Sequence, residues 1–239
     1  MGYIIFMIVL ISSMVVSKLI FRPSIGKIKA LKHNEELEKI TSKLPEDIVV
    51  AEEILDMIEA KKTNFTRPKV EQAKDTELSL YIGITNKIIL ADFKNNYARI
   101  QTIVHECIHS SQNRLLVIFN FIITNINMIL VVVLSLLAIF NVINLSIVTI
   151  VVFMATLLLQ FSVRTYLEVD AIKKARMLTE EYLDNKISTG EKRQLLQEYD
   201  KINALAMPFV IDYYYSVAMV MIVIYTIVRN GAAKHYSCE

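Results

Sequence analysis

The stretch from Leu115 to Val163 contains no charged residue, and it limits what this chain can fold into more than any other feature. A helix crosses the hydrocarbon core of a bilayer in about 20 residues, so the stretch is too long for one span. Polar turn formers gather at Asn141–Asn144, which favours two spans joined by a tight turn. With two further apolar runs, the sequence predicts a mainly α membrane protein with transmembrane helices at residues 3–21, 115–140, 145–163 and 209–228.

Composition agrees with a membrane class and gives no reason to expect a nucleic-acid partner. Hydrophobic residues make up 54% of the chain, above the roughly 45–50% of soluble domains, and the net charge is only +2. The first apolar run precedes its positive charges, Lys18 and Arg22, whereas a signal peptide carries them ahead of the run. We therefore expect an uncleaved span there. The two cysteines, Cys107 and Cys238, do not indicate a disulfide framework.

Lysine and arginine are unevenly shared between the two sides of the predicted membrane. Segment 22–114 holds 15 of them and segment 164–208 holds 8, whereas the other side has only Arg229 and Lys234. The positive-inside rule then places both polar segments in the cytoplasm and both termini outside. We expect a multi-pass protein of the plasma (inner) membrane with a cytoplasmic domain built from these two segments.

The polar segments carry both helical and β patterns. The sequence TELSLYIGITNKIILADF predicts a small β-hairpin with strands at Glu77–Ile82 and Lys87–Leu90. A capping box at Ser188–Glu191 predicts the start of a helix that runs to about Met207. In the second span, Asn120, Asn125 and Asn127 are expected to form hydrogen bonds between helices. Further helices are expected at Leu31–Leu44, Glu46–Lys62, Asn96–Asn113 and Tyr166–Leu183.

The predicted helix at 96–113 contains the motif HECIH, residues 105–109. His105 and His109 are four residues apart, so both imidazoles project from one face of the helix and can reach the same ion. Glu106 is placed to contact a water on that ion rather than the ion itself. Two imidazole ligands, a third protein ligand and an open fourth position favour a single Zn²⁺ per chain.

The third ligand is expected in the sequence YLEVDAIKKA, which directly follows the third span. The membrane hairpin 115–163 returns the chain to the side of the membrane that it left, so this segment lies on the same side as His105. Glu168 and Asp170 are both available there. They are two residues apart and point about 200° apart on a helix, so only one of them can face the metal.

The order of these features resembles a known family. HECIH on an amphipathic helix, then a membrane hairpin, then E-x-D-A on a basic helix, is similar to the bacterial membrane zinc metallopeptidases of the YugP type (neutral zinc metallopeptidase family) and, more distantly, to HtpX and the CAAX prenyl proteases. The YugP type commonly reads H-E-V-G-H-A-I-Q and later E-F-D-A-S. The residues that match here are His105, Glu106, His109, Gln112, Glu168, Asp170 and Ala171. Ile108 stands where the family has glycine, and Ser110 and Ser111 replace its Ala-Ile.

The resemblance implies a cytoplasmic α+β zincin-like (gluzincin) domain and a role for each matched residue. It implies that Glu168 is the third zinc ligand and that Asp170 is a carboxylate behind the ligands, such as those that orient a ligating histidine. By the same resemblance, the strand Lys87, Ile88, Ile89 and Leu90 is an edge strand that binds the substrate backbone by β-augmentation.

The function expected from these features is zinc-dependent hydrolysis of peptide bonds in membrane-associated or misfolded proteins, with Glu106 as the general base. The alternative is a non-catalytic zinc-binding membrane protein that acts as a partner-binding scaffold, and Ile108 in the glycine position favours it. A transporter is disfavoured because no charged residue lies deep inside any predicted span.

Overall fold

The computed structural model describes residues 2–21, 34–73, 79–92, 96–140 and 147–236, which are mostly helical with one small sheet. The chain divides into two compact units. Unit 1 contains Met1–Pro23, Phe119–Tyr166 and Pro208–Glu239, and unit 2 contains Ser24–Ile118 and Leu167–Met207. Each is described by itself.

Three helices are long and apolar enough to cross a membrane. They are α6 (Arg114–Ile139), α7 (Ile147–Leu183) and α8 (Thr189–Tyr236). Helix α1 (Gly2–Phe21) contributes a shorter apolar stretch, Ile11–Phe21, among the residues that the structure describes, so the fourth span stays a prediction. The predicted turn at Asn141–Asn144 lies outside the described residues.

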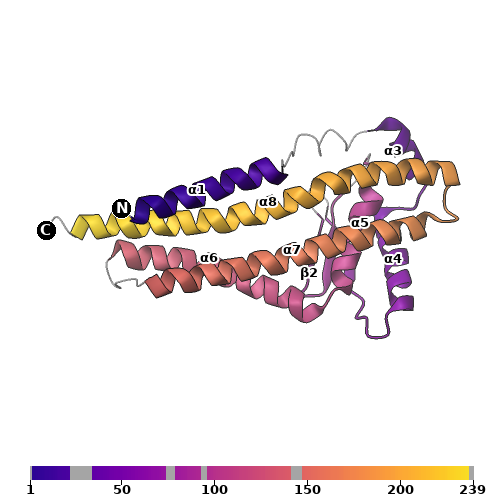
Figure 1. Ribbon diagram of the computed structural model, residues 1–239. Coiled ribbons are helices and arrows are strands. Elements are labelled where there is room, and N and C mark those ends of the chain that lie inside the picture. Colours follow the sequence, from indigo (N-terminus) through magenta and orange to yellow (C-terminus); the bar gives the residue numbers. More distant parts are fainter. Residues whose placement is uncertain (1, 22–33, 74–78, 93–95, 141–146, 237–239) are drawn as a thin grey trace. The chain divides into compact units, whose positions relative to one another are not determined.

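Helices α7 and α8 are longer than the sequence predicted (Figure 1). The predicted span 145–163 and the helix Tyr166–Leu183 are parts of one helix, α7. The predicted helix ending near Met207 continues through Pro208 into the last apolar run as α8. Pro208 lacks an N–H and so leaves the Ala204 carbonyl without its usual helical donor, but the helix does not end there. The capping box that opens α8 is confirmed, because the Ser188 backbone N–H donates to the Glu191 carboxylate at 3.0 Å.

Polar side chains join the helices inside unit 1. Asp212 on α8 is 3% exposed and accepts a hydrogen bond from Ser17 Oγ of α1 at 2.8 Å. Asn127 of α6 donates to Gln160 Oε1 of α7 at 2.7 Å, as expected of a bond between helices. Asn125 instead donates to the Phe121 carbonyl of its own helix.

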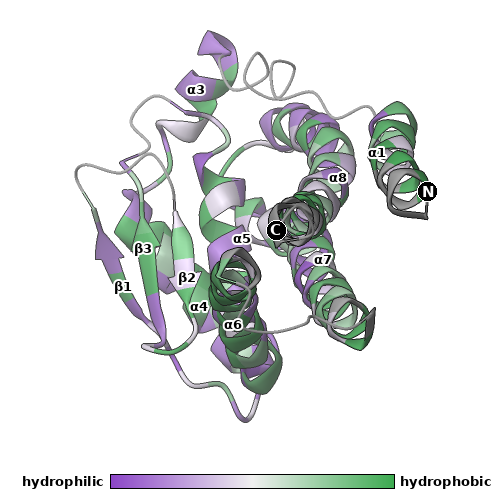
Figure 2. Ribbon diagram, turned by 90° about the vertical axis from the view of Figure 1, so that its left-hand side faces the viewer, coloured by the Kyte–Doolittle hydropathy of each residue, from purple (hydrophilic) through white to green (hydrophobic). Residues whose placement is uncertain are grey.

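Unit 2 contains a three-stranded sheet. Figure 2 shows the strands side by side in the order β1-β3-β2. Strands β2 (Leu80–Ile82) and β3 (Lys87–Leu90) are antiparallel, which confirms the predicted hairpin. Strand β1 (Lys69–Gln72) was not predicted, and it pairs with β3 in parallel. Asn86, at a positive φ of 49°, accepts from the Tyr81 hydroxyl at 2.8 Å and donates to the carbonyls before β1, so it joins the hairpin to that strand.

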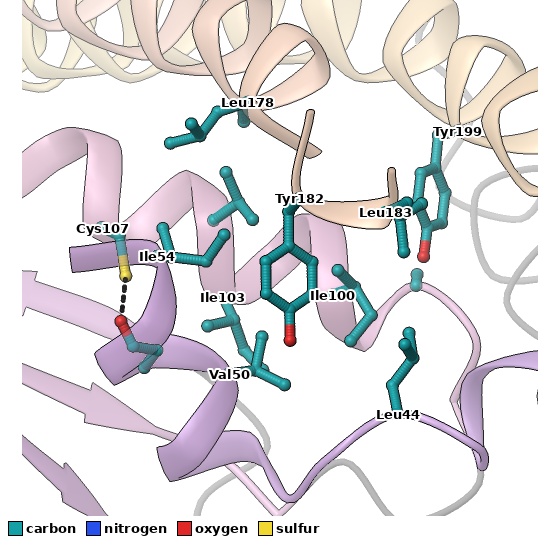
Figure 3. Close-up of a cluster of buried hydrophobic side chains, with 14 of the residues drawn as sticks. Leu44, Val50, Ile54, Ile100, Ile103, Cys107, Leu178, Tyr182, Leu183 and Tyr199 are labelled. Atoms are coloured by element: carbon teal, nitrogen blue, oxygen red, sulfur yellow. Dashed lines mark hydrogen bonds between the residues drawn. The ribbon is translucent and has the colours of Figure 1, made fainter. Parts of the chain in front are cut away.

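The core of unit 2 lies where the remaining helices meet (Figure 3). Helices α4 (Asp47–Lys61) and α5 (Arg99–Ser111) pack against each other, and the short α3 (Glu35–Thr41) adds Leu37 and Ile40. The parts of α7 and α8 that belong to unit 2 supply further apolar side chains. Figure 3 labels Leu44, Val50, Ile54, Ile100, Ile103, Cys107, Leu178, Tyr182, Leu183 and Tyr199. These contacts hold α5 on one face and leave its other face for polar residues.

Arg99, the first residue of α5, fixes the start of that helix. Its guanidinium donates to Asp47 at 2.7 Å and to three backbone carbonyls that precede α4, namely those of Thr41, Leu44 and Pro45. The Arg99 and Asp47 side chains are only 11% and 9% exposed. The buried Asp47 carboxylate and the Leu44 and Pro45 carbonyls therefore share the Arg99 guanidinium as a donor, while the Thr41 carbonyl also accepts from the Leu44 N–H.

Replacing Arg99 with leucine should lower the free energy of unfolding of unit 2 by about 3–5 kcal/mol, because the buried Asp47 carboxylate and the Leu44 and Pro45 carbonyls lose the guanidinium as donor. The measurement is the rate at which a thiol reagent modifies the buried Cys107, in the Cys238→Ser background, as denaturant is raised. The exposed Arg193→Leu is the control and should change this free energy by less than about 0.5 kcal/mol. Equal effects of the two substitutions would contradict the anchoring role of Arg99.

Candidate metal centre

Helix α5 presents both histidines of the HECIH motif on one side. Ile100, Ile103, Val104 and Cys107 are buried in the core, whereas His105 and His109 are half-buried at its edge. Their Nε2 atoms lie 3.0 Å apart, and the rings meet edge to face. The periodicity of the sequence thus separates a packing face from a ligand face on the same helix.

Helix α7 brings Glu168 to the two histidines. Glu168 Oε2 lies 3.3 Å from His105 Nε2 and 3.5 Å from His109 Nε2. The Glu168 side chain is 10% exposed, and its neighbours Leu167 and Ala171 are buried. His105, His109 and Glu168 form a group that could hold a metal ion, with one ligand atom from each. Of the two carboxylates that the sequence left open, Glu168 is the one in this group.

Gln112, directly after α5, orients His109. The Gln112 amide nitrogen donates to the Leu167 carbonyl at 2.7 Å and to Asp170 Oδ2 at 2.9 Å. Its oxygen therefore lies against His109 Nδ1, at 2.9 Å. Because an amide oxygen only accepts, Nδ1 carries the proton and the lone pair of Nε2 points toward His105 and Glu168. This is the tautomer that a metal ligand requires.

Asp170 does not enter the ligand group. It accepts from Gln112 and forms an ion pair with Lys174 at 2.8 Å, one turn further along α7. Burial would raise the pKa of Asp170, but the bonds from Lys174 and Gln112 outweigh it and lower that pKa. Asp170 thus reaches His109 only through Gln112, whose own role the sequence did not indicate beyond its match to the family pattern.

Glu106 is 8% exposed and lies beside the ligand group. Burial raises the pKa of its carboxyl, while the nearby His109 and His105 act in the opposite direction. The backbone N–H of Tyr81, on β2, donates to the Glu106 carboxylate. A carboxyl group held in this way, with a raised pKa, suits the uptake and release of a proton.

For His109, burial would lower the pKa, but the hydrogen bond to Glu168 and the charge of Glu106 outweigh it and the pKa is raised. The site therefore places two carboxylates and two imidazoles in one partly buried cluster. A cation bound between them would compensate the carboxylate charges.

Ile108, the departure from the family pattern, points into the core. It is 5% exposed and belongs to the same cluster as Ile100 and Ile103. Its side chain does not enter the ligand group.

The prediction that Lys87–Leu90 is an edge strand was wrong. It forms β3, the central strand, and pairs with β1 on one side and β2 on the other, so its backbone has no free edge for β-augmentation. Strand β2 stands at the edge of the sheet and supplies the Tyr81 N–H to Glu106. Strand β1 was not predicted, and without β1 the strand β3 would have been an edge.

Comparisons with protein-family models, curated proteins and solved structures found no match to this chain. The resemblance to the YugP-type metallopeptidases therefore stays an expectation.

Replacing Gln112 with leucine should weaken binding of a divalent transition metal by about 10–100-fold, because His109 loses the acceptor that fixes its tautomer. The affinity is measured on the full-length protein in detergent, in competition with a chromogenic chelator. Gln197→Leu, at an exposed position of α8, is the matched control. Unchanged affinity in Gln112→Leu, with Cys107 still protected from thiol reagents, would remove the orienting role.

Proposed function

We propose that this protein is a membrane-embedded zinc-dependent endopeptidase that hydrolyses peptide bonds of membrane-associated or misfolded proteins. The observation that carries the proposal is the convergence of His105, His109 and Glu168 beside the buried Glu106. We further propose a multi-pass protein of the plasma (inner) membrane, with the site on the cytoplasmic side.

The spacing of the ligand atoms supports zinc. Ligand atoms bound at about 2.0–2.1 Å to a tetrahedral ion lie about 3.3 Å from one another. The three separations in this site are 3.0, 3.3 and 3.5 Å. Two histidines and a carboxylate also suit non-haem iron, but the adjacent Glu106 favours hydrolysis, which needs a proton acceptor next to the ion.

Zinc in this position would lower the pKa of a water and polarise the peptide carbonyl. The protein's own part is proton transfer and orientation. Glu106 accepts the proton of the attacking water and delivers it to the leaving amine. The Tyr81 N–H holds the Glu106 carboxylate, and Gln112 keeps the His109 lone pair directed at the ligand group. Of the two edge strands, β1 and β2, the strand β2 is the one beside Glu106 and would offer its edge to an extended substrate.

Replacing Glu106 with glutamine should leave about one zinc per chain and lower peptidase activity by about 10²–10⁴-fold, because the amide keeps the shape but cannot accept the proton. Zinc is measured by mass spectrometry, and cleavage is followed on casein and on a single-span membrane reporter in detergent. Glu35→Gln, at an exposed position on α3, is the control. Wild-type protein that holds zinc and cleaves neither substrate would favour the scaffold instead.

Substitutions of the two carboxylates of α7, Glu168 and Asp170, should affect zinc binding to different extents. Glu168→Ala should lose nearly all bound zinc, because a ligand is gone, whereas Asp170→Ala should keep the site with an affinity lowered by about 10–100-fold. Both are measured by zinc content after dialysis at a fixed free zinc concentration. The opposite order would show that the ligand assignment is wrong.

A further inference from the structure

The hairpin turn of unit 2 lies against the first turn of a helix that is long and apolar enough to cross a membrane. A Cβ added to Gly83 would meet Val117 Cγ1 at 2.6 Å, closer than real Cβ atoms approach another atom. Gly83 is the first residue of the turn between β2 and β3, and Val117 belongs to the apolar stretch Arg114–Leu137 of α6. Glycine allows this contact because it has no side chain. The contact ties the turn to the point where α6 begins its apolar run.

The exposed side chains around this contact are apolar. In the described part of unit 2, the large apolar side chains that stand well exposed fall into two groups. One is on the helices α4 and α7. The other is at the hairpin and the start of α6, where Leu80 is 41% exposed, Ile84 48% and Leu115 78%.

The outer face of the hairpin is partly apolar. Side chains alternate along a strand, so Tyr81 and Ile88 face the core while Leu80, Ile82 and Ile89 share the other face. Ile82 and Ile89 are half-buried and Leu80 is exposed. Lys87, paired opposite Ile82, is on this face as well and forms an ion pair with Glu71 of β1, so the apolar part of the face is that of Leu80, Ile82 and Ile89.

A basic residue stands at the start of α6, next to this contact. Arg114 is exposed at the first position of α6. An arginine at the end of an apolar helix is typical of the lipid headgroup region.

We infer that the β2–β3 turn, with Ile84 at its tip, and the outer face of the hairpin contact the interface of the lipid bilayer beside the first turn of α6. The bilayer is favoured over a protein partner because the patch continues directly into an apolar helix whose own exposed residues need lipid. The apolar side chains would enter the interface and Arg114 would pair with headgroup phosphates.

One consequence rests on the proposed function. Strand β2, which holds Glu106 through the Tyr81 N–H, would lie at headgroup level, so the segment cleaved would be a juxtamembrane peptide rather than one delivered from bulk water. The lipid contact itself does not depend on that function, and its test below does not use cleavage.

The test places a bimane fluorophore on Ile84→Cys in the Cys238→Ser background, in the full-length protein in nanodiscs. Cys107 stays in place because it is fully buried and burial raises the pKa of its thiol. We expect a loss of fluorescence when plain phosphatidylcholine is exchanged for lipid brominated near the top of the acyl chain. Leu80→Cys, labelled in the same way, should show the same loss and covers the case in which Ile84→Cys fails to fold.

Met177→Cys is the matched control. Met177 is apolar and 72% exposed, and it lies 13 residues beyond Arg164 on the continuous α7, about 20 Å along the helix. Its label should keep its fluorescence in brominated lipid. The proposal is overturned if the labels on Ile84→Cys and Leu80→Cys lose no more fluorescence than the label on Met177→Cys while Cys107 remains protected. Quenching by a second, spin-labelled copy of the chain in place of lipid would equally overturn it.

Discussion

The candidate site depends on the register between α5 and α7. Helix α5 supplies two imidazoles, but the group becomes a metal site only when Glu168 stands opposite them. One residue of slip along α7 would turn the carboxylate by about 100°. The buried side chains of Leu167 and Ala171 and the bond from Gln112 to the Leu167 carbonyl hold that register. Helix α7 runs without a break from its apolar part to Glu168.

Helix α5 carries the core and the site at once, and its two faces need different kinds of support. The core face is held by apolar contact and by the Arg99 anchor at its start. The site face gathers carboxylates and imidazoles that cost free energy to bury. That cost is reduced by hydrogen bonds: the Tyr81 N–H of β2 donates to Glu106, and His109 Nδ1 donates to the oxygen of the Gln112 amide, whose nitrogen donates to α7. The sheet therefore takes part in the site although none of its side chains is a ligand.

Local patterns in the sequence were sufficient to predict several helices and the hairpin. The period of Ile100, Ile103 and Cys107 predicted α5, and GITN between two β-rich runs predicted the hairpin. Non-local pairing was not readable in the same way. The sequence KVEQ, which forms β1, has no strong β signal, and it pairs with β3 in parallel. Strand β1 was therefore not predicted, and β3 was taken for an edge strand. The helix that begins at the capping box was expected to end near Met207, but α8 continues through Pro208.

The type of side chain also did not reveal the orienting role of Gln112. A glutamine carries no charge to suggest a ligand or a base, and its importance here comes from using both ends of one amide for three partners. Once its nitrogen is committed to α7, its oxygen must face His109, and the tautomer of that ring follows.

The same helical geometry explains why Ile108 can replace glycine without touching the ligands. Position 108 lies about 300° around the helix from His105, and His109 about 40° from it, so the isoleucine turns toward the core face with Val104. Its extra volume has to be accommodated by the apolar neighbours on α4 and α7 rather than by the metal group. A departure from the pattern at this position is therefore a matter of core packing, and the chemistry of the site depends on the opposite face.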